Sequence, residues 1–328
     1  YGAIGNQYFR YYKLANAEAI TLSGQVSIRW IEQKMNNYLN NLLKTEDEDY
    51  VIASDTDSIY LNLGPLVDKF FANKSSDKAK VVELLDMVCS DKLEPYIDKC
   101  YSDLATYVSA YDQKMQMKRE NIADRGIWTA KKRYILNVWN SEGVAYTEPK
   151  LKMMGIEAVK SSTPAPCRKM IKDALKLMMT GTEEDVIEFI DKSRTEFKTL
   201  PPEQISFPRS VSDVVKYKSH SDIYIKGTPI HCRGALLYNY HILQNKLDAK
   251  YSLIQNGEKI KFCYLKKPNT IHENVISFIQ DFPTELGLDK YIDYDLQFEK
   301  SFLEPLKAIL DSIGWNVEKT VNLELFFA

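Results

Sequence analysis

The spacing of hydrophobic side chains changes period along the chain. In residues 13–43 apolar positions recur every three or four residues, as at Ile31 and Met35, with polar residues between them. This period predicts one long amphipathic helix. Residues 50–54 and 58–63 are strand-like runs that meet at an Asp-Thr-Asp triplet. They predict a β-hairpin with a polar tip.

The middle of the chain repeats this change of period. Residues 77–111 return to helical spacing, and we expect a break near Pro95, because proline lacks the backbone N–H that a helix interior needs. Strand-like runs dominate residues 113–154. The sequence Asn-Ser-Glu-Gly at 140–143 predicts a hairpin loop between two of these runs.

Helix start and stop signals then become frequent. Thr163 and Pro164 predict a helix start, with a capping hydroxyl and a proline at the first helical position. Gly181 and Thr182 predict the end of that helix and the cap of the next one. The predicted fold class is therefore α+β, with a domain boundary near residues 155–162.

The segments around this boundary are expected to differ in character. The part before it reads as an α+β unit, and the part after it reads as largely helical. Within the second part, residues 201–230 are expected to be irregular and residues 302–313 mostly helical.

Composition limits the classes of protein to consider. The chain has 328 residues, of which 45% are hydrophobic and 27% charged, which is ordinary for a globular protein with room for two domains. No run approaches the roughly 20 apolar residues of a membrane span, so no membrane partner is expected. The five cysteines are scattered and the four histidines form no metal-binding motif. These counts argue against a disulfide framework or zinc and fit a reducing cytosol.

Charge is unevenly distributed although the formal net charge is only −2. Residues 112–176 contain 14 Lys or Arg against 7 Asp or Glu, whereas residues 281–328 contain 4 against 10. A phosphate-binding surface followed by an acidic docking tail would have this pattern. Two solvated faces of opposite sign would have it too, and the counts leave both interpretations open.

The predicted hairpin tip carries the first candidate chemistry. Asp55 and Asp57 are two residues apart, so on a strand both side chains would leave the same face. Mg²⁺ commonly takes one or two protein carboxylates together with substrate phosphates. A polar turn without a ligand is the plain alternative, because Asp favours turns. Ile59 and Tyr60 exclude an EF-hand loop, whereas a nucleotide-sugar transferase site remains open.

A second constellation follows at residues 131–134. Lys131, Lys132 and Arg133 are expected at a strand start, next to the phenol of Tyr134. Such a group can hold a phosphate backbone while the aromatic ring packs on a sugar or base. A solvated patch or a linear signal is the alternative.

Six segments resemble, in the same order, motifs of the T-even-type bacteriophage replicative DNA polymerases of family B. They are YGAIGN at 1–6, SDTDS at 54–58, TAKKRY at 129–134, KMMGIE at 152–157 with SSTP at 161–164, HCRGA at 231–235, and LELFF at 323–327. The resemblance implies a right-hand polymerase palm, an antiparallel sheet with packed helices, at 1–155, where 1–6 end the fingers-to-palm motif. It implies a mostly helical thumb with a clamp-docking tail at 156–328, and no fingers or exonuclease domain.

The same resemblance implies template-directed nucleotidyl transfer to a primer 3′ end. Two Mg²⁺ ions would be shared with a carboxylate that this chain does not contain. Asp57 would be a principal metal ligand, and Asp55 would lie beside it with a weaker role. Glu120 would be a further acidic residue near the site. Tyr1 and Gly2, with Asp57, would contact the incoming nucleotide in its nascent base pair.

Other residues are implied in partner binding. Primer-template DNA would contact a set of cationic and aromatic residues: Lys131, Lys132, Arg133, Tyr134, Lys216, His231 and Arg233. A sliding clamp would bind the apolar tail: Leu323, Leu325, Phe326 and Phe327. The alternative for that tail is a hydrophobic anchor on its own domain.

Several parts of a complete polymerase are expected to be missing. The chain starts at Tyr1, and we expect a fragment or one piece of a split protein, acting in the cytoplasm of an infected bacterial host. An N-terminal polymerase half, or the missing part of the same chain, would supply the rest, and the isolated chain would have negligible activity. The alternative function is a non-catalytic DNA- and clamp-binding fragment or subunit.

Overall fold

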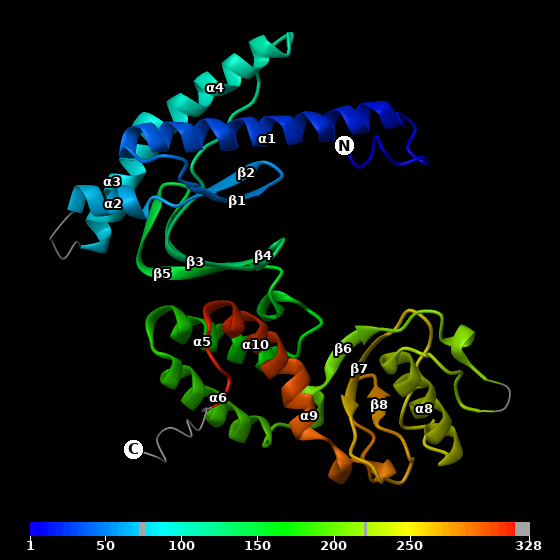
Figure 1. The fold of residues 1–328 in the computed structure, drawn as a ribbon. Helices are drawn as coiled ribbons and strands as arrows, with labels where there is room; N and C mark the ends of the chain where they lie inside the picture. Colours follow the sequence, from blue (N-terminus) through cyan, green and yellow to red (C-terminus); the bar gives the residue numbers. More distant parts are fainter. Residues whose placement is uncertain (72–76, 220–221, 319–328) are drawn as a thin grey trace, which may run out of the picture. The chain divides into compact units, whose positions relative to one another are not determined.

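The computed structural model describes residues 1–71, 77–219 and 222–318, and it combines helices with small antiparallel sheets (Figure 1). The predicted α+β class is confirmed at this level. The chain forms two compact units. Unit 1 comprises Tyr1–Asp124 and Asn137–Lys150, and unit 2 comprises Arg125–Leu136 and Leu151–Ala328. The assignment of a palm and a thumb on either side of residue 155 stays a prediction.

Unit 1 is organised around the long helix α1 (Leu14–Leu43), which confirms the helix predicted over residues 13–43. Ile31, Met35 and Leu39 recur every four residues on one face and are fully buried. They share a core with strand β1 (Val51–Asp55) and helix α4 (Glu94–Tyr107). Burying each of these side chains stabilises the unit by about 1.5–3 kcal/mol. This shared core therefore holds helix α1 against the hairpin that contains β1.

The predicted hairpin is confirmed. Strand β1 pairs antiparallel with β2 (Ser58–Leu61), with Asp55 opposite Ser58. Helix α2 (Gly64–Phe71) follows and was not predicted, because the sequence showed only the end of a strand-like run at residue 63. The side-chain oxygen of Asn62 accepts a hydrogen bond from the Gly64 N–H at 3.1 Å, which satisfies the first backbone donor of the helix.

The break expected near Pro95 takes a specific form. Helix α3 (Lys78–Val88) continues into α4 through one π-helical turn, Cys89–Leu93. A wider turn at this place accommodates the missing N–H of Pro95 without ending the helical path. The helical prediction for residues 77–111 is thus confirmed over most of its length.

A three-stranded sheet contributes segments to both units. Its order is β3 (Asn121–Ala130), β4 (Arg133–Ser141) and β5 (Val144–Met154), which confirms strands within residues 113–154. The loop predicted at 140–143 is also confirmed, with Gly143 at a φ of 87° in the turn between β4 and β5.

Unit 2 begins with two helices, α5 (Ala165–Thr180) and α6 (Glu183–Phe197). The cap predicted at Thr182 is confirmed, because its hydroxyl and the Asp185 carboxylate bond reciprocally to backbone N–H groups. The cap predicted at Thr163 is wrong. Pro164 occupies the N-cap position and no side chain caps α5, so Thr163 is buried one residue earlier.

The rest of unit 2 contains a sheet that was not predicted. Strands β6 (Phe207–Ser210), β7 (Lys259–Tyr264) and β8 (Val275–Phe278) pair antiparallel in that order. Helix α8 (Ile230–Gln244) packs on β8 (Figure 1). Gly234 permits this close approach, since an added Cβ would meet the hydroxyl and backbone of Ser277.

Short helices complete the second unit. They are α7 (Pro202–Ile205), α9 (Tyr294–Phe298) and α10 (Glu304–Leu310), with a π turn at Glu299–Leu303 joining the last two. The helical prediction for residues 302–313 is confirmed. Among the helices that the structure describes, none has the length and apolar character needed to cross a membrane.

Candidate functional site

The acidic tip of the β1–β2 hairpin is a tight turn. Asp55 ends β1, and Thr56 and Asp57 form the turn, with Thr56 at a φ of 55°. The Asp57 N–H donates to the Asp55 carbonyl oxygen at 2.6 Å, and the Ser58 hydroxyl donates to the same oxygen at 3.1 Å. The argument that strand alternation places both carboxylates on one face is wrong here, because Asp57 lies in the turn.

The two carboxylates at this tip have different surroundings. Asp55 is half-buried, and the Thr56 hydroxyl donates to its Oδ1 at 3.0 Å. Asp57 is exposed to solvent. Burial raises the pKa of Tyr101 on α4, and the negative charges of Asp57 and Asp98 raise it further.

Helix α1 holds the base of the hairpin through Asn36. Its side-chain oxygen accepts hydrogen bonds from the N–H groups of Tyr50 and Val51, both at 2.9 Å. Its amide nitrogen donates to Asp49 at 2.8 Å. Sequence analysis did not identify Asn36 as a functional residue. In the sequence Asn36 follows the apolar position Met35, so it lies beside the apolar face of the helix, but nothing local indicates that it contacts the hairpin.

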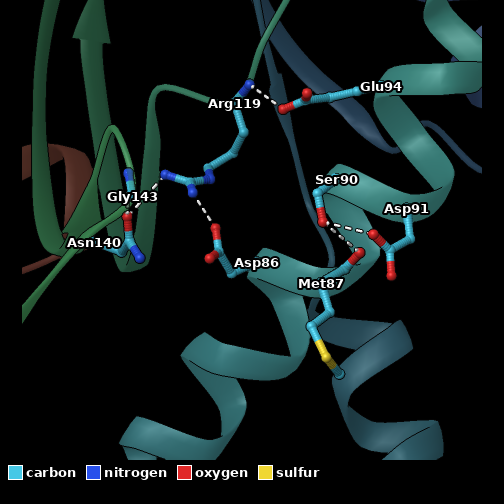
Figure 2. A network of polar contacts seen from close by, with 8 residues as sticks. All are labelled: Asp86, Met87, Ser90, Asp91, Glu94, Arg119, Asn140 and Gly143. Carbon is cyan, nitrogen blue, oxygen red and sulfur yellow. Dashed lines mark hydrogen bonds and ion pairs between the residues drawn. The ribbon is translucent and has the colours of Figure 1, made fainter.

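A polar network around Arg119 fixes the approach to strand β3 (Figure 2). The guanidinium forms an ion pair with Asp86 and donates to the side-chain oxygen of Asn140 at 2.8 Å. The Arg119 N–H donates to Glu94 at 3.0 Å, and Asn140 also accepts from the Gly143 N–H at 3.1 Å. The guanidinium of Arg119 thereby links α3 to the end of β4, and its backbone N–H links the same residue to α4. Sequence analysis did not predict this network.

Glu120 directly follows this network. It was expected on a neighbouring strand and lies one residue before β3, with its side chain exposed. Its carbonyl oxygen accepts a hydrogen bond from the Glu142 N–H at 2.7 Å. The backbone of Glu120 is therefore fixed at the sheet, while its carboxylate is accessible to solvent.

The donors at the hairpin fit a hard divalent cation. Asp55 and Asp57 present carboxylate oxygens, the ligand type that Mg²⁺ takes in proteins. The exposure of Asp57 leaves room for waters or phosphate oxygens beside it. Across residues 1–71, 77–219 and 222–318, no group of three or more His, Cys, Asp or Glu side chains is placed to hold a metal ion.

The basic run at residues 131–134 differs from its prediction. Lys131 and Lys132 form the turn between β3 and β4, with Lys132 at a φ of 60°, and only Arg133 and Tyr134 belong to the strand. Gly155, at a φ of 67°, lies against this turn, and an added Cβ would meet the carbonyl oxygen of Lys132. The glycine of the KMMGIE segment thus permits a close approach of two backbones.

Arg133 is engaged inside unit 2. Its guanidinium donates to both carboxylate oxygens of Glu157, at 2.9 and 2.7 Å, and Lys160 bonds the same group at 2.8 Å. Partial burial acts to raise the pKa of Glu157, but these hydrogen bonds outweigh it and hold the pKa below its ordinary value. Tyr134 is buried, with its ring 6.4 Å from that of Trp128.

The predicted thumb residues have mixed surroundings. Lys216 is exposed, with its ammonium 5.9 Å from the centre of the Tyr217 ring. Burial lowers the pKa of His231 on α8, and the charge of Arg209 lowers it further. Arg233 donates to the side-chain oxygen of Asn274 at 2.6 Å, so its charge is partly used within the fold.

The remaining predicted residues lie at the chain ends. Tyr1 and Gly2 are exposed in a series of turns before α1, and the Tyr1 carbonyl oxygen accepts from the Gly5 N–H at 3.0 Å. The predicted clamp-binding residues Leu323, Leu325, Phe326 and Phe327 lie outside the described residues.

Comparisons with known proteins bear on this site. No protein-family model matches the chain. The chain is 33% identical over 339 residues to the DNA-directed DNA polymerase of Enterobacteria phage T4, an alignment that covers 100% of this chain and 37% of the relative. It is 37% identical over 335 residues to that of Escherichia phage RB69, covering 98% of this chain and 37% of the relative. The resemblance to T-even-type phage DNA polymerases is therefore confirmed. It covers nearly the whole of this chain but only 37% of each relative.

Proposed function

We propose that this chain forms the palm and thumb portion of a DNA-directed DNA polymerase. Residues 1–155 would be the palm and residues 156–328 the thumb. The observation that carries the proposal is the similarity of the whole chain to two phage DNA polymerases, with the SDTDS segment at a hairpin tip. Template-directed nucleotidyl transfer to a primer 3′ end is the reaction that this assignment implies.

The acidic residues of unit 1 would provide the metal ligands. Asp57 would bind metal directly, because its carboxylate is exposed in the turn. Asp55 would support it from the end of β1, where Thr56 orients its carboxylate. Glu120 would contribute a further negative charge near the reaction. Two Mg²⁺ ions, when bound, supply charge stabilisation for the attacking and leaving oxygens. The set would be completed by a carboxylate from the rest of the polymerase.

The substrate contacts are assigned on the same basis. Tyr1 and Gly2 would contact the incoming deoxynucleotide. The primer-template duplex would contact Lys131 and Lys132 in the turn and Tyr134 in the strand. Arg133 would support that turn through Glu157 while also adding positive charge. In the thumb, Lys216, His231 and Arg233 would contact phosphate or sugar.

The proposed protein partners follow from the fraction of a complete polymerase that this chain covers. The chain spans 37% of the length of its relatives, and we propose that an N-terminal polymerase half, or the rest of the same chain, completes the enzyme. A sliding clamp would bind the segment at 323–327. The assembled enzyme would act in the cytoplasm of an infected bacterial cell.

Primer extension tests this proposal. We expect primer extension when the chain is combined with the remaining polymerase portion. Asp57→Asn should reduce the rate of extension by about 10³-fold, because losing a metal ligand removes several kcal/mol of transition-state stabilisation. Asp47→Asn is the matched control. Asp47 is exposed at a φ of 55°, which Asn adopts readily, so this variant should extend primers normally.

Two outcomes would contradict the proposal. Full primer extension by the Asp57→Asn enzyme would show that the acidic tip takes no part in the chemical step. Retained DNA binding without any extension by the assembled wild-type protein would favour the alternative, a DNA- and clamp-binding module without chemistry of its own.

A further inference from the structure

Helix α5 carries a row of basic side chains on one face. Arg168, Lys169, Lys172 and Lys176 are spaced so that all four lie within about 100° of one another around the helix axis. The row extends about 12 Å, because eight residues separate its ends at roughly 1.5 Å each. In the sequence these four residues belong to the basic stretch at 112–176, for which a phosphate-binding surface was one of two open interpretations, and none of them was singled out.

The packing of α5 fixes the direction of this face. Cys167, Ile171, Ala174 and Leu175 are fully buried in the core of unit 2 and occupy the other side of the helix. The three lysines of the row are exposed and Arg168 is half-buried. The basic face is therefore part of the folded unit and does not depend on a ligand to orient it.

A hollow lies along the row. It has a volume of about 500 Å³, and Ala158 and Val159 of the short 3₁₀ turn Glu157–Val159 line it together with α5. Arg168 and Lys169 also line a second hollow of about 800 Å³. Asp173 is the one acidic residue among those lining the first hollow. Four cations against one anion give this surface a local positive charge.

The charges of this face are available for binding. In the described part of the chain, none of the four side chains forms an ion pair or a side-chain hydrogen bond. Arg133, by contrast, is paired with Glu157. An unpaired cation releases counterions when it meets a phosphate, whereas a paired cation must first lose its partner.

We propose that the basic face of α5, defined by Arg168, Lys169, Lys172 and Lys176, binds the phosphate backbone of nucleic acid. The inference rests on the proposed polymerase function. An extended row suits a polyanion, because one strand of a duplex advances about 3.4 Å per nucleotide and 12 Å therefore spans three to four of them. A single phosphate group would instead need converging donors. The contacts are to phosphates, so binding is independent of base sequence.

Salt dependence of DNA binding tests this surface. The full chain with Lys169→Gln, Lys172→Gln and Lys176→Gln should bind a DNA duplex about tenfold or more weakly, and the slope of log K against log salt should fall by about 2–3. Gln has a helix propensity close to that of Lys, so α5 should remain folded, which circular dichroism would verify.

The matched control removes the same charge elsewhere. Lys80→Gln, Lys192→Gln and Lys307→Gln change three exposed lysines on α3, α6 and α10. This variant should keep the wild-type slope to within about 1 unit. Equal losses in both variants would overturn the inference, because total charge would then explain the binding.

Other results would also overturn it. An unchanged slope in the α5 variant would exclude this surface while leaving the Asp57 test of the polymerase proposal intact. Preferential binding of the wild-type chain to anionic phospholipid vesicles over duplex DNA would assign the row to a membrane surface. Loss of extension in Asp57→Asn with an unchanged α5 slope would separate the two proposals.

Discussion

The acidic tip at residues 55–57 and the basic turn at residues 131–134 have similar backbones and opposite charge. Each joins two strands through a tight turn, and each places a non-glycine residue at positive φ, Thr56 at 55° and Lys132 at 60°. They differ in how the fold uses their charges. Asp57 is exposed, whereas Arg133 is held by Glu157 at 2.7 and 2.9 Å.

The contrast between Asp57 and Arg133 shows that a charged residue in the sequence is not always available to bind a ligand. Part of the basic turn stabilises unit 2, and its charge is offset by Glu157. The α5 face has less distinctive sequence, yet its four cations have no partner in the described part of the chain. A charged motif in the sequence therefore indicates a candidate binding site. The ion pairs within the fold determine how many of its charges remain available to bind a ligand.

The largest effect is expected at Gly155, where the basic turn approaches another backbone. Gly155→Ala should lower the free energy of unfolding by about 3 kcal/mol or more, because strain at positive φ adds to a clash with the Lys132 carbonyl. Gly257→Ala is the control, since Gly257 also has positive φ but open space around it, and about 1 kcal/mol is expected there. Equal losses in urea unfolding would show that the close approach is unimportant.

The ion pair beneath the basic turn should produce a smaller, pH-dependent effect. Glu157→Gln should cost about 1–2 kcal/mol of unfolding free energy at pH 7. The folded-state pKa of Glu157 is lowered, so the wild-type advantage is full above its unfolded pKa of about 4.3 and is lost as pH falls through the folded pKa. The two proteins should therefore converge in acid.

Urea unfolding at several pH values would measure this convergence. Glu188→Gln is the control, because Glu188 is exposed on α6 and should change stability by less than about 0.5 kcal/mol at any pH. A difference for Glu157→Gln that stays constant down to pH 3 would contradict the assigned ion pair.

The smallest effect is expected at the two positive-φ residues themselves. Lys132→Gly should stabilise unit 2 by about 1 kcal/mol, because glycine adopts this conformation without strain. Thr56→Gly should stabilise less, since it also removes the hydroxyl that donates to Asp55 at 3.0 Å. Thermal unfolding of both variants would measure the difference. A larger gain at Thr56 than at Lys132 would mean that this hydrogen bond contributes nothing.

Local patterns predicted the elements that local interactions determine. Helix α1 follows from apolar spacing, and the β1–β2 hairpin follows from two strand-forming runs around a polar tip. Sheet β6–β8 was missed because β6 has only four residues, includes Pro208, and pairs with a strand some 50 residues later. Nothing within a short window of sequence specifies such a pairing.

The candidate site shows the same limit. Asp55 and Asp57 were found because their spacing and context are local. Asn36 and Arg119 were missed because their roles depend on partners 13 or more residues away in the sequence. Arg133 was identified, but its pairing with Glu157, 24 residues away, could not be predicted from a run of basic residues.

The proposed function requires that the Asp57 carboxylate serve the chemical step and not DNA binding. The most direct measurement compares wild type with Asp57→Asn in the assembled polymerase, recording the single-turnover rate of nucleotide incorporation and the dissociation constant for primer-template DNA on the same samples. We expect a rate reduced by about 10³-fold with a dissociation constant changed less than about threefold. An unchanged rate, or a loss confined to DNA affinity, would contradict it.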